Sequence, residues 1–138
     1  MSTEVNPFIM LDGTAKEAIQ FYEQALGAKV LFQQTFGDAP EGTLPADAKE
    51  RIAHSVLSVD ETVFFVSDSI PGDSVVTGNH VGICLSISDM SVSRQIYEAL
   101  QQGGTIEMPL QEIYFSPAYG VVTDQFGVTF QIFTKRPR

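Results

Sequence analysis

Residues 14–27 read TAKEAIQFYEQALG and residues 89–104 read DMSVSRQIYEALQQGG, so the chain carries two related helical patterns. The first contains Phe21-Tyr22-Glu23 and the second Ile96-Tyr97-Glu98, 75 positions later. An apolar run precedes each pattern and strand-like sequence follows it. A unit this long that occurs twice favours two equivalent modules, because a solenoid needs three or more short repeats. Paired modules would create a shared cleft, where we expect function to reside.

Both helices have recognisable ends. Thr14 and Glu17 match a capping box, in which the hydroxyl and the carboxylate satisfy amides of the first turn. Apolar residues then recur at helical spacing as far as Gly27, which suits a left-handed C-terminal cap. The second helix is predicted from Asp89 to about residue 102, with Gly103-Gly104 as its stop.

Alternating or continuous apolar runs around the helices predict strands. Residues 37–50 read as a loop, 67–79 as the connector between the halves and 111–116 as a loop or irregular strand. The predicted strands are 8–11, 29–36, 51–59 and 62–66, then 80–87, 105–108, 119–123 and 128–133. The order βαβββ occurs twice, which predicts an α+β fold.

Composition narrows the function classes. Seventeen acidic and eight basic residues give a formal net charge of −9, which disfavours nucleic-acid and anionic membrane partners. The N-terminus lacks a signal-peptide pattern, and no apolar run approaches the roughly 20 residues of a membrane span. Cys84 is the only cysteine, so an intrachain disulfide is impossible, and its apolar surroundings predict a small buried hydrophobe. We expect a cytoplasmic protein.

The order of elements, with Phe21-Tyr22, Gly27 and Asp124-Gln125-Phe126-Gly127 before the last strand, resembles the glyoxalase/bleomycin-resistance/extradiol-dioxygenase superfamily, also called vicinal oxygen chelate. Within it the chain is similar to the PhnB-like group, often labelled 3-demethylubiquinone methyltransferase-like. Further matching segments are residues 7–13, 53–55, 108–111 and 128–132. The methyltransferase label has no support in the residues, because no Gly-rich first loop of a doubly wound sheet is present.

The resemblance implies a single domain over residues 1–138, with module 1 at about 5–68 and module 2 at about 80–134. Each module would form a curved half-barrel, with the two halves paired around a pocket. Many members of the superfamily dimerise, so a homodimer is expected.

The resemblance also locates the metal ligands of the superfamily's enzymes. Three of these positions fall on Pro7, Gly82 and Gln131. Proline and glycine offer no ligand atom in their side chains, and the amide lacks the charge of a glutamate. We therefore expect neither the standard metal site nor a cofactor. The alternative is a displaced metal site built from His80, His54 and Asp68.

His54 shares a strand face with Val56 and Ser58, and the hairpin at residues 60–61 is expected to bring it close to Ser67 and Asp68. A histidine beside a carboxylate is the usual arrangement of a general base, so His54 and Asp68 are the candidate catalytic residues. The other interpretation is a structural hydrogen bond.

Gln131 is the best candidate for ligand binding. Alternation groups it with Thr129 and Phe133, opposite Phe130 and Ile132, where a polar side chain facing a cavity needs a partner. Three aromatic residues, Tyr114, Phe115 and Tyr119, precede the last hairpin and suit an apolar or planar ligand, although they could equally be core or dimer contacts.

Two functions follow. The first is binding of a small organic molecule without metal, in the way that the resemblance implies for bleomycin-resistance proteins. The second is a superfamily enzyme of lyase, isomerase or dioxygenase type, using a divalent metal at a displaced site or His54 as base. A scaffold dimer without a pocket is the least favoured.

Overall fold

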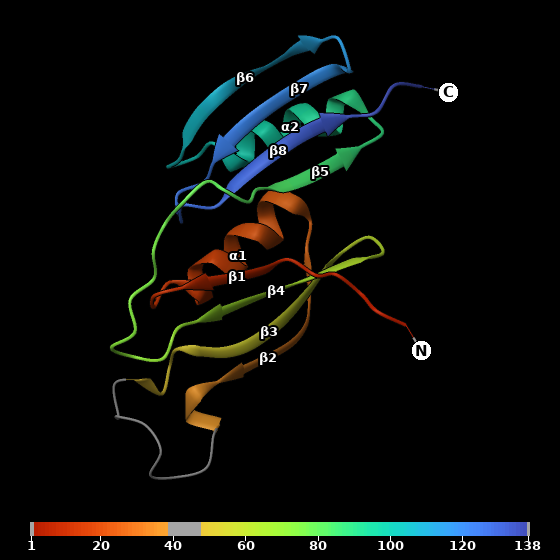
Figure 1. The fold of residues 1–138 in the computed structure, drawn as a ribbon. Coiled ribbons are helices and arrows are strands. Elements are labelled where there is room, and N and C mark those ends of the chain that lie inside the picture. Colours follow the sequence, from red (N-terminus) through yellow and green to blue (C-terminus); the bar gives the residue numbers. More distant parts are fainter. Residues whose placement is uncertain (1, 39–47, 138) are drawn as a thin grey trace. The chain divides into compact units, whose positions relative to one another are not determined.

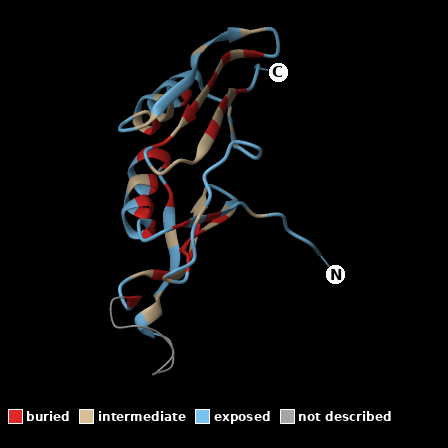
Figure 2. Cartoon of the chain, turned by 60° about the vertical axis from the view of Figure 1, so that its left-hand side comes forward, coloured by how far each residue is buried: buried red, intermediate tan, exposed pale blue. Residues whose placement is uncertain are grey.

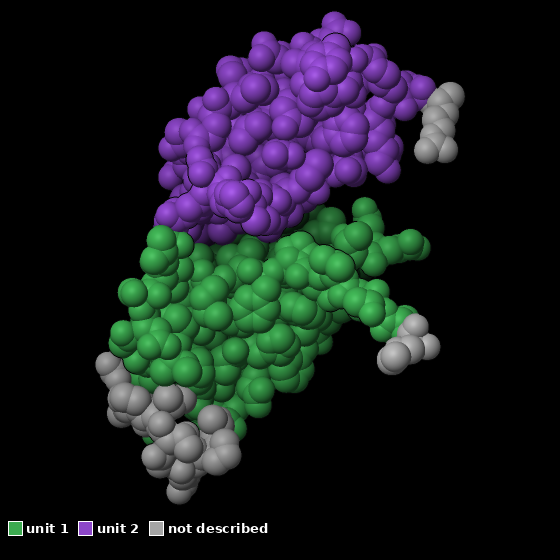
Figure 3. All heavy atoms as spheres, viewed as in Figure 1, with its two compact units in different colours: residues 1–76 green, residues 77–138 purple. Residues whose placement is uncertain are grey.

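The computed structural model describes residues 2–38 and 48–137. The chain divides into two compact units, unit 1 at residues 1–76 and unit 2 at residues 77–138 (Figure 3). The division falls within the predicted connector, 67–79. Most of the predicted loop, residues 39–47, lies outside the described residues. No helix in the described part of the chain is long and apolar enough to cross a membrane.

Unit 1 has the predicted βαβββ order, with a short 3-10 helix after its second strand. Its elements are β1 (Phe8–Leu11), α1 (Ala15–Leu26), β2 (Lys29–Thr35), η1 (Phe36–Asp38), β3 (Ile52–Val59) and β4 (Thr62–Asp68). The strands form one sheet in the order β1-β4-β3-β2, in which β1 and β4 are parallel and the other pairs antiparallel. The helix α1 lies across one face of this sheet (Figure 1).

Unit 2 repeats the arrangement. Its elements are β5 (Ile83–Ile87), α2 (Met90–Leu100), β6 (Thr105–Ile113), β7 (Ser116–Thr123) and β8 (Thr129–Thr134). The sheet order β5-β8-β7-β6 matches that of unit 1 strand for strand. The predicted α+β class with two βαβββ modules is confirmed.

The core of each unit lies between its helix and one face of its sheet. In unit 1, Tyr22 of α1 is fully buried and its ring centroid is 6.0 Å from that of Phe64 on β4. In unit 2, buried and half-buried residues alternate along β7 and β8, as Figure 2 shows. The buried set of β8 includes Phe130 and Ile132, so these side chains point to the face that α2 covers.

The helix ends differ from the expected capping box. Thr14 precedes α1, but its side chain makes no capping hydrogen bond. Gly27 does adopt the left-handed conformation, with φ at 67°, which is strained for residues with a Cβ. In α2 the predicted start is confirmed, because Asp89 Oδ1 accepts hydrogen bonds from the backbone N–H groups of Ser91 and Val92.

Three strands of unit 2 differ from their predicted bounds by three residues or more, and one of them is β7, which begins at Ser116 instead of residue 119. The strand β5 begins at Ile83, so residues 80–82 precede it. The strand β6 continues to Ile113, because register shifts against β7 absorb its irregular part. Gly120 of β7 permits this close approach, since a Cβ there would lie 3.1 Å from the Cα atom of Leu110. Pro109 is tolerated because β6 is an edge strand.

The segment Asp124-Gln125-Phe126-Gly127 forms a tight turn before β8. Asp124 Oδ1 accepts hydrogen bonds from the backbone N–H groups of Phe126 at 2.9 Å and Val128 at 3.0 Å. Gly127 has a positive φ of 87°. The turn fixes where β8 begins and therefore which of its residues face away from α2.

Candidate functional site

Each sheet has one face that its own helix does not cover, here called the open face of that unit. Phe64 contacts α1 in unit 1, so Phe65, the next residue, points to the open face. Strand pairing then places on this face the residues Phe8 and Met10 of β1, Phe32 and Gln34 of β2, His54 and Val56 of β3, and Ser67 of β4.

His54 lies among aromatic side chains on the unit 1 open face. Its ring centroid is 5.4 Å from that of Phe65 and 6.1 Å from that of Phe32. The imidazole is half-buried and makes no hydrogen bond within residues 2–38 and 48–137. His54 is therefore placed to contact a molecule lying on this face.

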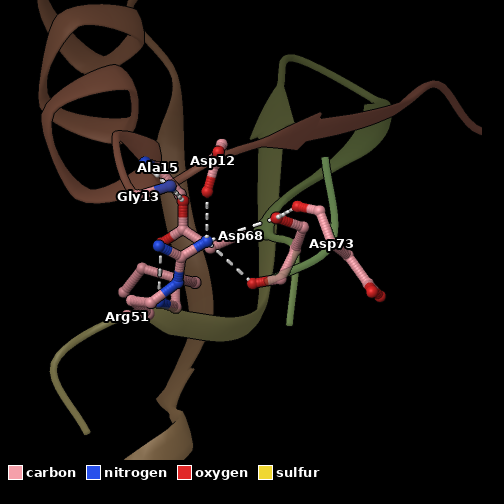
Figure 4. Close-up of polar contacts among 8 residues, drawn as sticks. Asp12, Gly13, Ala15, Arg51, Asp68 and Asp73 are labelled. Atoms are coloured by element: carbon pink, nitrogen blue, oxygen red, sulfur yellow. Dashed lines mark hydrogen bonds and ion pairs between the residues drawn. The ribbon is translucent and has the colours of Figure 1, made fainter. Parts of the chain in front are cut away.

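Asp68 is on the opposite face of the same sheet. Its Oδ1 accepts hydrogen bonds from the backbone N–H groups of Gly13 at 2.8 Å and Ala15 at 3.0 Å, and its Oδ2 accepts one from Ile52 at 2.9 Å (Figure 4). The carboxylate thus caps α1 and ties it to the start of β3. Asp68 is only three residues beyond Phe65, and strand alternation turns it away from His54. The expected His54–Asp68 pair is not formed, which corrects the prediction of their closeness.

Arg51 extends this network beside Asp68. Its guanidinium donates hydrogen bonds to Asp12 Oδ1 at 2.8 Å and to the carbonyl oxygen of Ser69 at 2.9 Å (Figure 4). Every residue in this network lies at or next to an end of β1, β3 or β4, or in the first turn of α1. The cluster holds the fold of unit 1 together and leaves the carboxylate of Asp68 fully occupied.

The unit 2 open face carries Gln131 and three aromatic residues. Gln131 and Phe133 are half-buried, in the orientation that alternation predicts. The ring of Phe115 is 5.0 Å from that of Tyr119 and 6.1 Å from that of Phe133. The Gln131 amide makes no hydrogen bond with the described part of the chain, so its donors and acceptor are available to another molecule.

The other two predicted ligand-binding residues, Tyr114 and His80, are both exposed. Tyr114 and Phe115 form the two-residue turn between β6 and β7, and Tyr114 is 91% exposed. His80 is exposed and precedes β5. The predicted strand over residues 80–87 therefore starts three residues too early, and His80 lies outside it.

Potential metal ligands do not converge. Within residues 2–38 and 48–137 no group of three or more His, Cys, Asp or Glu side chains could hold a metal ion. His54 and Asp68 point to opposite faces of one sheet, so they do not form the displaced site considered above. Cys84 is exposed, not buried as expected, because it lies on the unit 2 open face as the strand partner of Gln131.

A hollow of about 260 Å³ lies behind the sheet of unit 2, between α2 and the strands β6 and β7. Arg94 and Glu98 of α2 and Glu112 of β6 are among its lining residues, and all three are exposed. Its volume falls below the usual range of ligand pockets, about 300–1,000 Å³. The open faces are the better candidates.

Sequence reasoning missed the unit 1 open face as a binding surface. The sequence gives Phe8, Phe32 and Phe65 no role beyond their predicted strands, yet Phe8 is 51% and Phe32 48% exposed. The sequence does indicate an aromatic side chain on this face. Phe64 and Phe65 are adjacent in a predicted strand, so they cannot both face α1.

Comparisons with known proteins agree with the fold. The model of the Glyoxalase/Bleomycin resistance protein/Dioxygenase superfamily matches residues 4–132. Protein YjdN of Escherichia coli is 27% identical over 141 residues, covering 93% of this chain and 92% of that protein. The crystal structure of protein PA1353 from Pseudomonas aeruginosa has a TM-score of 0.89 and 29% identity, covering 99% and 100% of the two chains. The structure of a PhnB protein from Bacillus cereus has a TM-score of 0.80 and 20% identity, covering 96% of this chain and 99% of that chain. At this identity the likeness concerns the fold alone.

Proposed function

Because the chain belongs to the glyoxalase/bleomycin resistance protein/dioxygenase superfamily, we propose that it is a PhnB-like member that binds a small organic molecule on the open faces of its sheets, without the standard metal site. The observation that carries this proposal is the unpaired side-chain amide of Gln131 on the unit 2 open face. Its amide has no hydrogen-bond partner within the described residues, and it stands beside Phe133 in a row of half-buried side chains. A few polar groups within an apolar surface are typical of small-molecule sites.

The enzyme alternative depends on His54 or on a displaced metal. A general base of this kind is normally oriented by a carboxylate, and Asp68 is committed to three backbone N–H groups on the other face. No contact of His54 favours catalysis over binding, so we retain His54 as a contact residue for the ligand.

Binding can be tested by fluorescence, because the chain has no tryptophan to interfere with a naphthyl probe. We expect 2-naphthamide to bind saturably, with an affinity unchanged by EDTA. Gln131→Ala should weaken binding about fivefold, the size of one neutral hydrogen bond. Gln95→Ala, an exposed glutamine on α2, is the matched control and should bind normally.

Two results would contradict the proposal. One is the absence of saturable binding for planar aromatic probes. The other is a stoichiometric divalent ion in the purified protein that is lost in His54→Ala or His80→Ala, which would favour the enzyme.

We also propose a homodimer in the cytoplasm. Edge strands carry exposed apolar side chains, such as Leu31 on β2 and Ile106 on β6, which a second copy could cover. Light scattering during size exclusion should give twice the 15.1 kDa of one chain. A mass of one chain at micromolar concentration would contradict the dimer, and cell fractionation tests the location.

A further inference from the structure

The unit 1 open face indicates the chemical class of the ligand, an inference that rests on the proposed function. We propose that this face binds an uncharged planar aromatic molecule, whose ring lies on a row of apolar side chains and whose polar edge meets Ser67, His54 and Gln34.

The apolar row crosses all four strands. Strand pairing places Phe8 beside Phe65, Phe65 beside Val56, and Val56 beside Phe32. The rings of Phe8 and Phe65 are 6.0 Å apart in an edge-to-face arrangement. Phe8 and Phe32 at the two ends are about half exposed. Such a row offers a flat apolar surface against which an aromatic ring packs favourably.

The polar row runs parallel to it, two residues later on β1, β2 and β4 and two residues earlier on β3. Met10 is the strand partner of Ser67, and Gln34 is the partner of His54. Continuing the β3–β4 register from Val56 and Phe65 by two residues places His54 opposite Ser67. Side chains directly opposite each other on one face are about 5 Å apart at Cβ. Three hydrogen-bonding groups therefore adjoin the apolar row along one side.

Ser67 is the observation that points to a ligand. The residue is 2% exposed, and its Oγ has no hydrogen-bond partner in residues 2–38 and 48–137. Burying a hydroxyl without a partner is unfavourable, so a polar group of a ligand would remove this penalty. Met10 beside it is 43% exposed and has a flexible unbranched side chain, which can move aside to admit such a group.

The charge of the face selects a neutral ligand. None of the side chains in the two rows carries a fixed charge, and Lys29 on β2 lies beyond them, opposite Ser58. A charged ligand would lose hydration here without gaining an ion pair. The net charge of −9 further disfavours an anion. Aryl carboxamides and phenols combine a flat ring with the neutral polar edge that the two rows accept.

The test compares three probes on the intact protein by naphthyl fluorescence: neutral 2-naphthamide, anionic 2-naphthoate and cationic 2-naphthylmethylamine. We expect the amide to bind at least tenfold more tightly than either charged probe. Ser67→Ala should weaken amide binding about fivefold, as expected for one neutral hydrogen bond. Ser58→Ala, on the same face but on the far side of the apolar row, should bind like the parent protein.

Gln34→Ala provides an independent variant, because an exposed side chain on the edge strand β2 can be removed without unfolding. It too should weaken binding of the amide. Unchanged binding in both Ser67→Ala and Gln34→Ala would overturn the inference. If binding is then weakened in Gln131→Ala, the proposed function survives with unit 2 as the site. If no probe binds, both proposals fail.

Discussion

At the scale of single residues, Asp68 is a structural anchor, although it is also one of the two candidate catalytic residues that the sequence offers. Its two carboxylate oxygens satisfy three backbone N–H groups from two separate segments, around residue 14 and at Ile52. Asp68, Ala15 and Ile52 are buried, so the N–H groups of Ala15 and Ile52 would have little access to water without the carboxylate. An unsatisfied buried donor costs about 1–3 kcal/mol.

Asp68→Ala should therefore destabilise unit 1 by about 3 kcal/mol or more, since three donors lose their acceptor together. Urea denaturation followed by circular dichroism measures the loss. Asp73→Ala is the control, because the contact of Asp73 with Ser69 uses its backbone oxygen and its side chain is exposed. Equal stability of the two variants would contradict the anchoring role.

The strand alternation explains which residue predictions succeed. Gln131 faces away from α2, as its alternation with Phe130 and Ile132 predicts. The hairpin at residues 60–61 does bring β3 against β4, but strand alternation leaves His54 and Ser67 on one face and turns Asp68 to the other. The cap that Asp68 provides could not be read from local sequence, because it acts on Ala15 from 53 positions away.

At the scale of elements, the two helices begin in different ways. The helix α1 is capped from β4, whereas α2 carries its own cap in Asp89. Hydrogen bonds from the Ser91 hydroxyl, and then from the backbone N–H groups of Val92 and Ser91, hold the pKa of the Asp89 carboxyl below its ordinary value of 3.8. Local sequence signals succeed for α2 because the cap is local.

The cap of α2 should make the stability of unit 2 depend on pH. Because the folded pKa of Asp89 is lowered, its contribution is fully present above pH 3.8 and is lost as the pH falls through the lower folded pKa. Asp89→Ala should be less stable than the parent at neutral pH, and the difference should disappear in strong acid. Thermal unfolding across this range measures it; a difference that persists below the folded pKa would rule out the charge effect.

The strands of unit 2 show that local sequence does not fix where a strand begins and ends. The predicted strand begins at His80, but residues 80–82 have no strand pairing. In β6, Pro109 and the polar residues after it predict a break. The strand continues because register shifts and the close approach at Gly120 keep it paired with β7. Both outcomes depend on a neighbouring strand, which local sequence does not specify.

At the scale of the whole molecule, the repeat is the strongest signal in the sequence. It predicts two units of the same order, and the sheets β1-β4-β3-β2 and β5-β8-β7-β6 match strand for strand. The repeat preserves the scaffold, while the open faces diverge, with Ser67 and His54 in one unit and Gln131 and Cys84 in the other. The proposed binding therefore depends on side chains that the repeat itself does not predict.

The methionines report directly on where a ligand binds. Met10 lies on the unit 1 open face, Met108 pairs with Val121 on the unit 2 open face, and Met90 lines the hollow beside α2. In a protein labelled with ¹³C at its methionine methyls, titration with 2-naphthamide should shift the resonances of Met10 and Met108 and leave that of Met90 unchanged. A shift confined to Met90, or no saturable shift at any methionine, would contradict binding on the open faces.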